Sequence, residues 1–320
     1  MQYKDSRQQT TGIIVNTKIN VSVDYAKLTR SMCHHLFMDG VPYLIENDVI
    51  KPIKRPRLRG MLGHMFYVKG LEHQHKKWPK DKRAPGFYRL YARFLNYTTL
   101  YAPEMPTILC EGISDPIYLK AAMHSRFASF PELVEKGGDK YKLKVKFFKF
   151  SNSSAKLQRL SGGSNEIKDL IYEYDTRIAG FRATTNQPLI VVVDSDSGSK
   201  EIFNRIESKT GKKVGGPDTF YHLQDNLYVV PVPRQAGKVE TAIEDLFDPA
   251  LLNETVGGRN FNPKNRDNDT ATEYGKGTFA REVVAKKKAE IDFSNFDPLL
   301  AAIRDAMADF HAKVMPAATA

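Results

Sequence analysis

The clearest hydrophobic pattern in the chain is a set of short apolar runs that alternate with amphipathic segments beyond residue 102. Runs rich in Ile, Leu, Val and Phe predict buried strands at 107–110, 143–150, 189–193 and 227–230. Apolar residues at helical spacing predict helices at about 116–127, 166–174, 199–209, 277–288 and 298–314. Strands that are apolar on both faces and alternate with helices favour the α/β fold class, with a mainly parallel sheet covered on both sides.

The first hundred residues follow a different pattern. Residues 11–21 favour extended structure around a turn. Helices are predicted at 24–38, 58–68 and 86–100, with a loop rich in His, Lys and Pro at 73–85. This region is therefore expected to be mainly helical.

The ends of these segments carry recognisable signals. The first helix is expected to begin with Asp24 as its N-cap and to stop at Gly40, with an apolar face of Leu28, Met32 and Leu36. Polar, glycine-rich stretches at 151–165 and 253–274 predict loops. The proline-containing segment 101–106 marks a boundary, so we expect a mainly helical domain at 1–102 and an α/β domain at 103–320.

Charge separates the two predicted domains. The chain holds 48 Lys and Arg against 37 Asp and Glu, a net charge of +11. The first hundred residues hold 18 basic and 7 acidic residues, whereas the rest of the chain holds 30 of each. The segment 51–93 alone has 13 basic and 2 acidic residues, interleaved with aromatic residues. The whole excess of positive charge therefore lies in the first third.

Such a segment favours nucleic-acid binding, because basic side chains contact phosphates and aromatic faces stack on bases. A solvated basic surface over an aromatic core is the alternative. The residues expected to contact nucleic acid are Lys51, Lys54, Arg55, Arg57, Arg59, Lys69, Lys76 and Lys77.

Acidic residues follow two of the predicted strands. Glu111 ends the strand at 107–110, with Asp115 four residues later, and Asp194 and Asp196 follow the strand at 189–193. Ligands collect at the carboxyl ends of parallel strands. If the two strands are neighbours, up to four carboxylates converge, and that much negative charge is costly unless cations neutralise it. Mg²⁺ or Mn²⁺ is the expected cofactor, because both prefer oxygen ligands and both support phosphodiester chemistry.

Each of these residues also has a purely structural interpretation. Asp115 before Pro116 is suited to capping a helix. Asp196 before a Ser-Gly pair is suited to shaping a turn. Glu111 at the end of a strand can be a solvated charge. The combination of strand-E-G-x-x-D with strand-D-x-D carries more weight than any single member.

Two segments resemble the signature motifs of the Toprim domain, namely TILCEGISDP at 107–116 and IVVVDSDSG at 190–198. The resemblance implies a Rossmann-like α/β domain that uses divalent metal for phosphodiester chemistry. Glu111, Asp194 and Asp196 match its metal-binding acids, with Glu111 also catalytic. Asp115 matches an acidic position that nucleases of the overcoming-lysogenization-defect (OLD) type add for a second metal ion.

Later segments are similar to the OLD-type pattern as well. They are IEDLF at 243–247, KGTFA at 276–280 and IDFSNF at 291–296. The resemblance implies that Lys276 is catalytic and stabilises phosphoryl charge, although an exposed lysine that starts a helix is the alternative. Glu240 and Glu244 lie one helical turn apart and could add ligands, or could simply be solvated.

The first hundred residues resemble the segment that follows the catalytic motif in retron and group II intron reverse transcriptases. The match covers TGIIVNTKINV at 11–21 and LTRSM at 28–32, and it continues into the helical thumb with LRGMLG at 58–63. A thumb grips a primer–template duplex. The chain has no Tyr-x-Asp-Asp motif and no fingers or palm. It is therefore similar to the C-terminal part of a retron reverse transcriptase–Toprim fusion, or to one product of a split version.

Several classes of function are disfavoured. Two cysteines cannot form a disulfide framework or a cysteine metal site, and the eight histidines show no ligand spacing. There is no nucleotide-binding glycine motif. No apolar run approaches the roughly 20 residues of a membrane span, and the N-terminus lacks a signal sequence. A cytoplasmic location is expected, and self-association is left open.

The resulting hypothesis is a metal-dependent nuclease that cleaves RNA or DNA as the toxic effector of a retron antiphage defence system. Its expected partners are the retron RNA–DNA hybrid (msDNA), the non-coding RNA, and reverse-transcriptase palm and fingers in the same or a companion chain. The alternative is a non-catalytic nucleic-acid-binding subunit of a reverse transcriptase complex. Primase-like synthesis is a third, weaker option, because no nucleotide-binding motif is present.

Overall fold

The chain divides into two compact units. The computed structural model describes residues 9–10, 13–14, 19–70, 84–138, 140–264 and 269–314. The first unit comprises residues 1–100, 152–159 and 175–184, and the second comprises 101–151, 160–174 and 185–320. The first unit therefore includes two short segments that lie far beyond residue 102 in the sequence.

The first unit is mainly helical. Its helices are α1 (Val23–Asp39), α2 (Arg55–Gly70) and α3 (Gly86–Asn96), the last continued by a π-helical turn at Tyr97–Tyr101. Its strands are β1 (Gln9–Thr10), β2 (Ile13–Ile14) and β3 (Asn20–Val21) in one antiparallel sheet, and the hairpin of β4 (Tyr43–Glu46) and β5 (Val49–Pro52). The three predicted helices are confirmed, whereas the hairpin was not predicted. Most of the predicted loop at 73–85 lies outside the described residues.

Helix α1 corrects two details of the sequence analysis. Ser22 is the N-cap, because its hydroxyl accepts a hydrogen bond from the Tyr25 amide, and Asp24 lies in the first turn. Leu28 is 42% exposed, whereas Thr29 is fully buried. Seven residues make almost two full helical turns, so position 29 lies above Leu36, while position 28 is rotated away from it by roughly 80°. Gly40 ends the helix in the left-handed conformation, as predicted.

The second unit is built on a five-stranded, mainly parallel sheet, which confirms the predicted α/β class. The strands are β6 (Thr107–Cys110), β9 (Lys146–Phe147), β10 (Leu189–Val193), β11 (Tyr221–Gln224) and β12 (Leu227–Pro231). Their order is β11-β12-β10-β6-β9, and only the edge strand β11 is antiparallel. From β6 the chain proceeds to β9 on one side, and from β10 it proceeds to β12 on the other.

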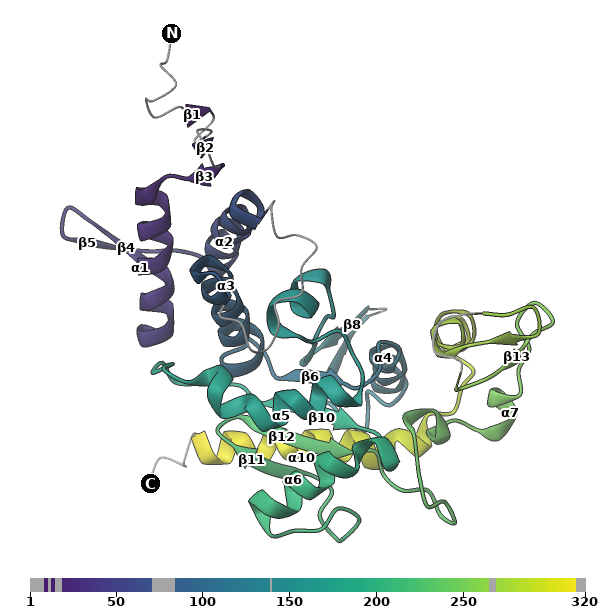
Figure 1. Cartoon of the computed structure of the whole chain (residues 1–320). Coiled ribbons are helices and arrows are strands. Elements are labelled where there is room, and N and C mark those ends of the chain that lie inside the picture. The colour runs from purple at the N-terminus through teal and green to yellow at the C-terminus, as the bar shows by residue number, and fades with distance from the viewer. Residues whose placement is uncertain are drawn as a thin grey trace. The chain divides into compact units, whose positions relative to one another are not determined.

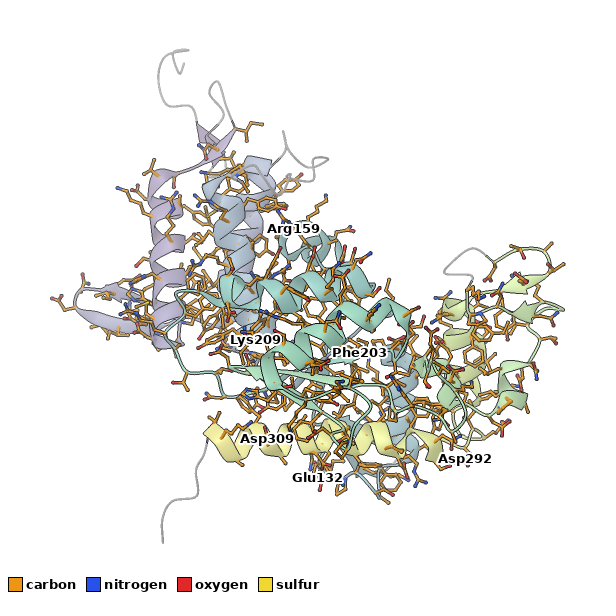
Figure 2. The ribbon with its side chains drawn as sticks, turned by 60° about the horizontal axis from the view of Figure 1, so that its bottom comes forward. Glu132, Arg159, Phe203, Lys209, Asp292 and Asp309 are labelled. Carbon is orange, nitrogen blue, oxygen red and sulfur yellow. The ribbon has the colours of Figure 1, made fainter. Side chains whose placement is uncertain are left out.

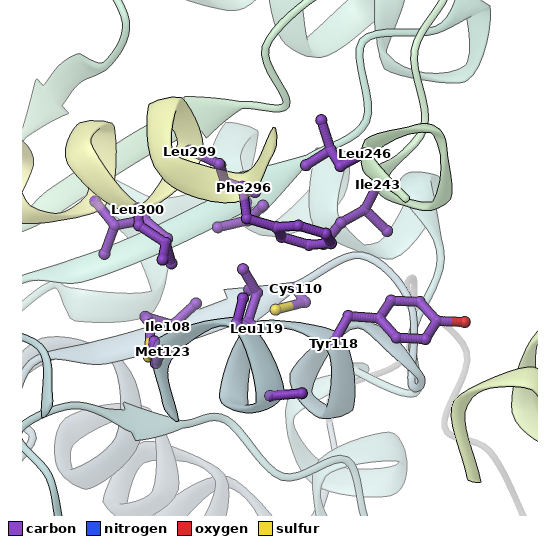
Figure 3. Close-up of a cluster of buried hydrophobic side chains, with 14 of the residues drawn as sticks. Ile108, Cys110, Tyr118, Leu119, Met123, Ile243, Leu246, Phe296, Leu299 and Leu300 are labelled. Atoms are coloured by element: carbon purple, nitrogen blue, oxygen red, sulfur yellow. The ribbon is translucent and has the colours of Figure 1, made fainter. Parts of the chain in front are cut away.

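The helices of this unit are α4 (Asp115–Ser125), α5 (Ser164–Ile178), α6 (Lys200–Thr210), α7 (Pro249–Leu252), α8 (Lys276–Thr278), α9 (Ala285–Lys287) and α10 (Asp297–Val314). The longer helices and the π-helical segment Phe279–Val284 supply core residues that cover the sheet, whereas α7, α8 and α9 bury none. Alternate strand residues such as Ile108 and Cys110 pack with Leu119 of α4 and Leu300 of α10 in one buried cluster (Figure 3).

Helix α10 packs along β12 (Figure 1). Its Asp309, labelled in Figure 2, accepts a hydrogen bond of 2.7 Å from the Tyr228 hydroxyl and so ties the helix to that strand. No helix in the described ranges is both long and apolar enough to span a bilayer.

Several elements between the main ones differ from the predictions. The strand expected at 143–150 is reduced to β9 and is preceded by an unpredicted hairpin of β7 (Val134–Gly137) and β8 (Lys140–Leu143). The segment expected to be a loop at 151–165 contains a helical turn at Ser154–Gln158. The expected loop at 253–274 contains the short strands β13 (Asn260–Phe261) and β14 (Glu273–Tyr274). These pieces are only two to five residues long, too short to show a period in the sequence.

Candidate metal centre

The two strands that end in acidic residues are neighbours, as the sequence analysis required. Strands β6 and β10 run parallel, with Cys110 opposite Val192. Glu111 and Asp194 therefore leave the sheet at the same carboxyl edge. The connections from β6 and β10 run in opposite directions, so this edge is the topological switch point, where open α/β sheets bind their ligands.

Asp115 is held at this edge by an unusual contact. It occupies the first turn of α4 and is 4% exposed. Its Oδ2 accepts a hydrogen bond of 2.7 Å from the amide of Gly112, which precedes the helix. The N-cap position belongs to Ser114, which makes no side-chain capping bond. Helix capping alone therefore does not explain Asp115.

Gly112 is a site residue that the sequence analysis did not single out. A Cβ atom at this position would lie 2.4 Å from Asp115 Oδ1, which is far inside ordinary van der Waals contact. Only glycine allows the carboxylate to fold back over the backbone here. The E-G-x-x-D spacing was the available signal, because it places a residue without a side chain beside the carboxylate.

A third segment brings Glu244 to the same place. Ser195 and Thr241 form a two-way backbone bridge, with N···O distances of 2.8 and 2.9 Å. The bridge fixes the 3₁₀ turn Ile243–Leu246 beside the end of β10. The amide of Ile243 donates to Asp194 Oδ1 at 2.9 Å. Glu244 itself is 3% exposed, so the solvated alternative for this residue is wrong.

Lys276 provides a positive charge within the cluster. Its Nζ donates to Glu244 Oε2 at 2.8 Å, and the two side chains are 28% and 4% exposed. The buried Tyr118 hydroxyl donates to the Lys276 backbone carbonyl at 3.2 Å and so fixes the start of α8. The alternative of a fully exposed lysine does not hold. Glu244 Oε1 is buried and, among the described residues, has no hydrogen-bond partner.

The electrostatics confirm that these groups share one environment. Burial, followed by repulsion from Glu244, raises the pKa of Asp115 to about 7. Burial, followed by repulsion from Asp115, Glu244 and Glu111, raises the pKa of Asp194 to about 8. Burial by itself lowers the pKa of Lys276, but the attraction and hydrogen bond to Glu244, together with the charges of Asp194 and Asp115, raise the pKa overall. The cluster therefore holds more carboxyl groups than one ammonium group can balance, and Asp115 and Asp194 tend to keep their protons.

Asp196 has a structural role in addition to the metal-binding role that the D-x-D motif predicts. It is the N-cap of the short 3₁₀ helix Ser197–Ser199, and its Oδ1 accepts from the Ser199 amide at 3.2 Å. The structure thus gives Asp196 the turn-shaping role that the sequence analysis kept as the alternative. Glu240 is exposed and accepts a hydrogen bond from the Ser197 amide at 3.0 Å.

The residues present fit a divalent cation chemically. The donors are all carboxylate oxygens, as Mg²⁺ and Mn²⁺ prefer, and one buried oxygen of Glu244 is unused. Within the described ranges, no three His, Cys, Asp or Glu side chains are already placed to hold a metal ion together. Their oxygens are engaged by the Gly112 and Ile243 amides and by Lys276. Binding of a cation therefore requires small side-chain rotations and release of the protons on Asp115 and Asp194.

The predicted nucleic-acid contacts lie in the first unit. Lys51, Lys54, Arg57 and Arg59 are exposed, although Lys51 pairs with Glu46 at 2.6 Å. Arg55 is partly buried, with its guanidinium 5.7 Å from the centre of the Tyr97 ring. Burial, followed by the charge of Arg30, lowers the pKa of Lys69. Lys76 and Lys77 lie outside the described residues.

The aromatic residues of this basic region divide between the two interpretations. Phe66 packs against the rings of Phe87, Tyr88 and Tyr91, as a core residue does. Tyr67 is 63% exposed and is available for stacking. No protein-family model matches the chain, and no solved structure matches it significantly.

Proposed function

We propose that the second unit is a divalent-metal-dependent hydrolase of phosphodiester bonds in nucleic acid. The observation that carries this proposal is the convergence of Asp115, Asp194 and Glu244 with Lys276 at the switch point of a mainly parallel sheet. Glu111 follows β6 at the same edge. Buried carboxyl groups whose ionisation is this unfavourable without a cation suit a metal ion, and a lysine in the same centre suits an anionic substrate.

Each residue of the acidic cluster would have its own role in this reaction. Glu111, Asp194 and Glu244 would hold a first ion, and Asp115 would support a second. Such an ion, when bound, makes a water molecule easier to deprotonate and neutralises charge on a phosphoryl group. Lys276 would be free of Glu244 if that carboxylate turned to hold a cation, and its ammonium could then hold a phosphoryl oxygen. Gly112 and Tyr118 act as positioning residues for Asp115 and for the start of α8.

The resemblances extend this proposal to a biological role. The basic first unit would hold the RNA–DNA product of a retron as a reverse-transcriptase thumb does, with palm and fingers supplied elsewhere. The nuclease would then be the toxic effector of an antiphage defence system, restrained by its nucleic-acid partner until infection. The excess of 11 positive charges in the first hundred residues supports a polyanionic partner.

The experiment is a cleavage assay with the full chain. RNA and DNA are incubated with Mg²⁺ or Mn²⁺, and wild type is compared with Asp194→Asn and Glu111→Gln. The matched control is Glu201→Gln, which removes an exposed carboxylate on α6. We expect at least a hundredfold loss of cleavage in the two site variants and none in the control. Equal cleavage by wild type and Asp194→Asn would remove the proposed site.

A second candidate is a non-catalytic nucleic-acid-binding subunit. The ion pair between Lys276 and Glu244 favours it, because an internal ammonium can neutralise an acidic cluster permanently. In that case nucleic acid binds tightly, but divalent metal produces no cleavage and no increase in thermal stability.

A further inference from the structure

A row of exposed lysines lies on the second unit, far in sequence from the basic first hundred residues. The segment 136–149 alternates lysine with apolar residues over most of its length. Its lysines are all exposed: Lys136, Lys140, Lys142, Lys144, Lys146 and Lys149. The second unit holds 26 basic and 29 acidic residues, and six of the basic ones are these lysines, so the segment is a concentrated positive charge on an otherwise acidic unit.

The hairpin of β7 and β8 presents this row. Successive strand residues point to opposite faces, so Lys140 and Lys142 lie on one face of β8, whereas Tyr141 and its cross-strand partner Lys136 lie on the other. The exposed Lys144 and Lys146 continue the alternation beyond β8, and these four lysines form the outward row. Tyr141 stacks on His124 of α4, with ring centroids 4.6 Å apart and planes at 16°. The Lys136 ammonium lies 5.0 Å from the centre of the Phe127 ring. These contacts hold the hairpin on α4 and leave the lysine row outward.

The row lacks the internal partners that other lysines of this unit have. Lys212, Lys238 and Lys313 each pair with an aspartate at 2.5–2.6 Å. In the part of the chain that the structure describes, none of the four row lysines makes such an ion pair, although Lys142 lies opposite Glu135 in the hairpin register. Like charges at alternate positions of one strand repel each other. A row of lysines that lack internal acidic partners and repel one another would be stabilised by binding an external polyanion.

The spacing favours one phosphate backbone. Alternate residues of a strand lie about 6.5 Å apart, which is close to the distance between successive phosphates of an extended nucleic-acid strand. The exposed Lys120 adds a positive charge on α4 itself. Helix α4 begins at Asp115 and reaches His124 nine residues later, about 14 Å along its axis. It therefore connects the metal centre with the lysine row.

We propose that the lysine row of residues 140–146 binds the phosphate backbone of a single nucleic-acid strand that continues along α4 to the acidic cluster. This inference deepens the proposed function, on which it rests for the nature of the partner, by naming a single-stranded substrate and its path. It assigns nucleic-acid binding to the second unit in addition to the first.

The test measures binding, without cleavage, by fluorescence anisotropy of a short labelled single strand in EDTA. The variant replaces Lys140, Lys142 and Lys144 with Gln. The matched control replaces Lys212, Lys213 and Lys264, which are exposed lysines elsewhere on the same unit, with Gln. A third protein carries Arg at positions 140, 142 and 144 and so retains the charge. Circular dichroism checks that all three remain folded.

We expect the row variant to bind about tenfold more weakly at low salt, while the control and the Arg variant bind as wild type does. The slope of log affinity against log salt should fall by about 2, because each lost contact to a single strand contributes about 0.7. Unchanged affinity of the row variant would overturn the proposal, as would an equal loss in the control. Because no metal is present, failure of this test leaves the cleavage proposal separately testable.

Discussion

The contact between Gly112 and Asp115 gives a sharp prediction about how the metal centre is built. An alanine Cβ at position 112 would lie 2.4 Å from Asp115 Oδ1 and 3.0 Å from its Cγ. The backbone of Gly112 does not have a positive φ, so alanine meets only the carboxylate and not a strained conformation. Gly112→Ala must therefore displace Asp115 and break the 2.7 Å hydrogen bond to the Gly112 amide.

The loss of stability in Gly112→Ala can be worked out from the steric clash with Asp115 and from the lost hydrogen bond to the Gly112 amide. Overpacking of a filled site costs about 1–3 kcal/mol, and a hydrogen bond to a charged group contributes about 1.5–3 kcal/mol. Because displacing Asp115 relieves part of the first cost, we expect Gly112→Ala to lower the free energy of unfolding by about 3 kcal/mol. Displaced ligands should also weaken Mn²⁺ binding by about 10- to 100-fold.

A double-mutant cycle isolates this contact. In an Asp115→Ala background the clash is gone, so Gly112→Ala should change the free energy of unfolding by less than about 0.5 kcal/mol. Urea unfolding followed by circular dichroism measures all four proteins. The control is Gly60→Ala in α2, where a new Cβ meets nothing within 4 Å; it should not destabilise the protein. An equal cost of Gly112→Ala in both backgrounds would refute the steric reasoning.

The remaining predictions concern charge in the same cluster. Without metal, the free energy of unfolding should fall as pH rises from about 4 to about 8. The pKa values of Asp115 and Asp194, about 7 and about 8, lie above the ordinary 3.8, so the folded state binds more protons than the unfolded state in that window. Urea titrations at several pH values check this, and the dependence on pH should be weaker in Asp194→Asn. Mg²⁺ at 100 times its dissociation constant should stabilise the protein by about 2.7 kcal/mol. At one fixed Mg²⁺ concentration the stabilisation should be larger at pH 8 than at pH 6, and calorimetry with and without EDTA measures the shift. Lys276→Met should cost about 3 kcal/mol, because it leaves Glu244 buried and unpaired, and added Glu244→Gln should recover most of that loss; an unchanged melting temperature in Lys276→Met would contradict the ion pair.

Long apolar segments made most of the fold predictable. The run Leu189–Val193 is buried at every position, so its composition alone identifies a central parallel strand. The pairing of β6 with β10 could be inferred from the two acidic motifs that end them. The short β11 and the hairpin of β7 and β8 could not, because their exposed polar residues resemble those of loops.

The candidate site was predictable only where the sequence places residues directly at strand ends. Glu111, Asp115 and Asp194 satisfy that condition. Glu244 lies 50 residues beyond Asp194 and reaches the cluster through the bridge of Ser195 with Thr241, a tertiary contact that no local pattern encodes. For Asp196 the sequence offered both a metal-binding and a turn-shaping role. Its backbone is still extended, and its Oδ1 caps the 3₁₀ helix that begins at Ser197.

The most direct test of the central claim is anomalous diffraction from crystals of the full chain grown with Mn²⁺. The account predicts a manganese peak within bonding distance of carboxylate oxygens from Glu111, Asp194 and Glu244, with the ammonium of Lys276 moved away from Glu244. Ordered carboxylates that keep their contacts to Lys276 and to the Gly112 and Ile243 amides, with no peak at this edge under saturating Mn²⁺, would contradict it.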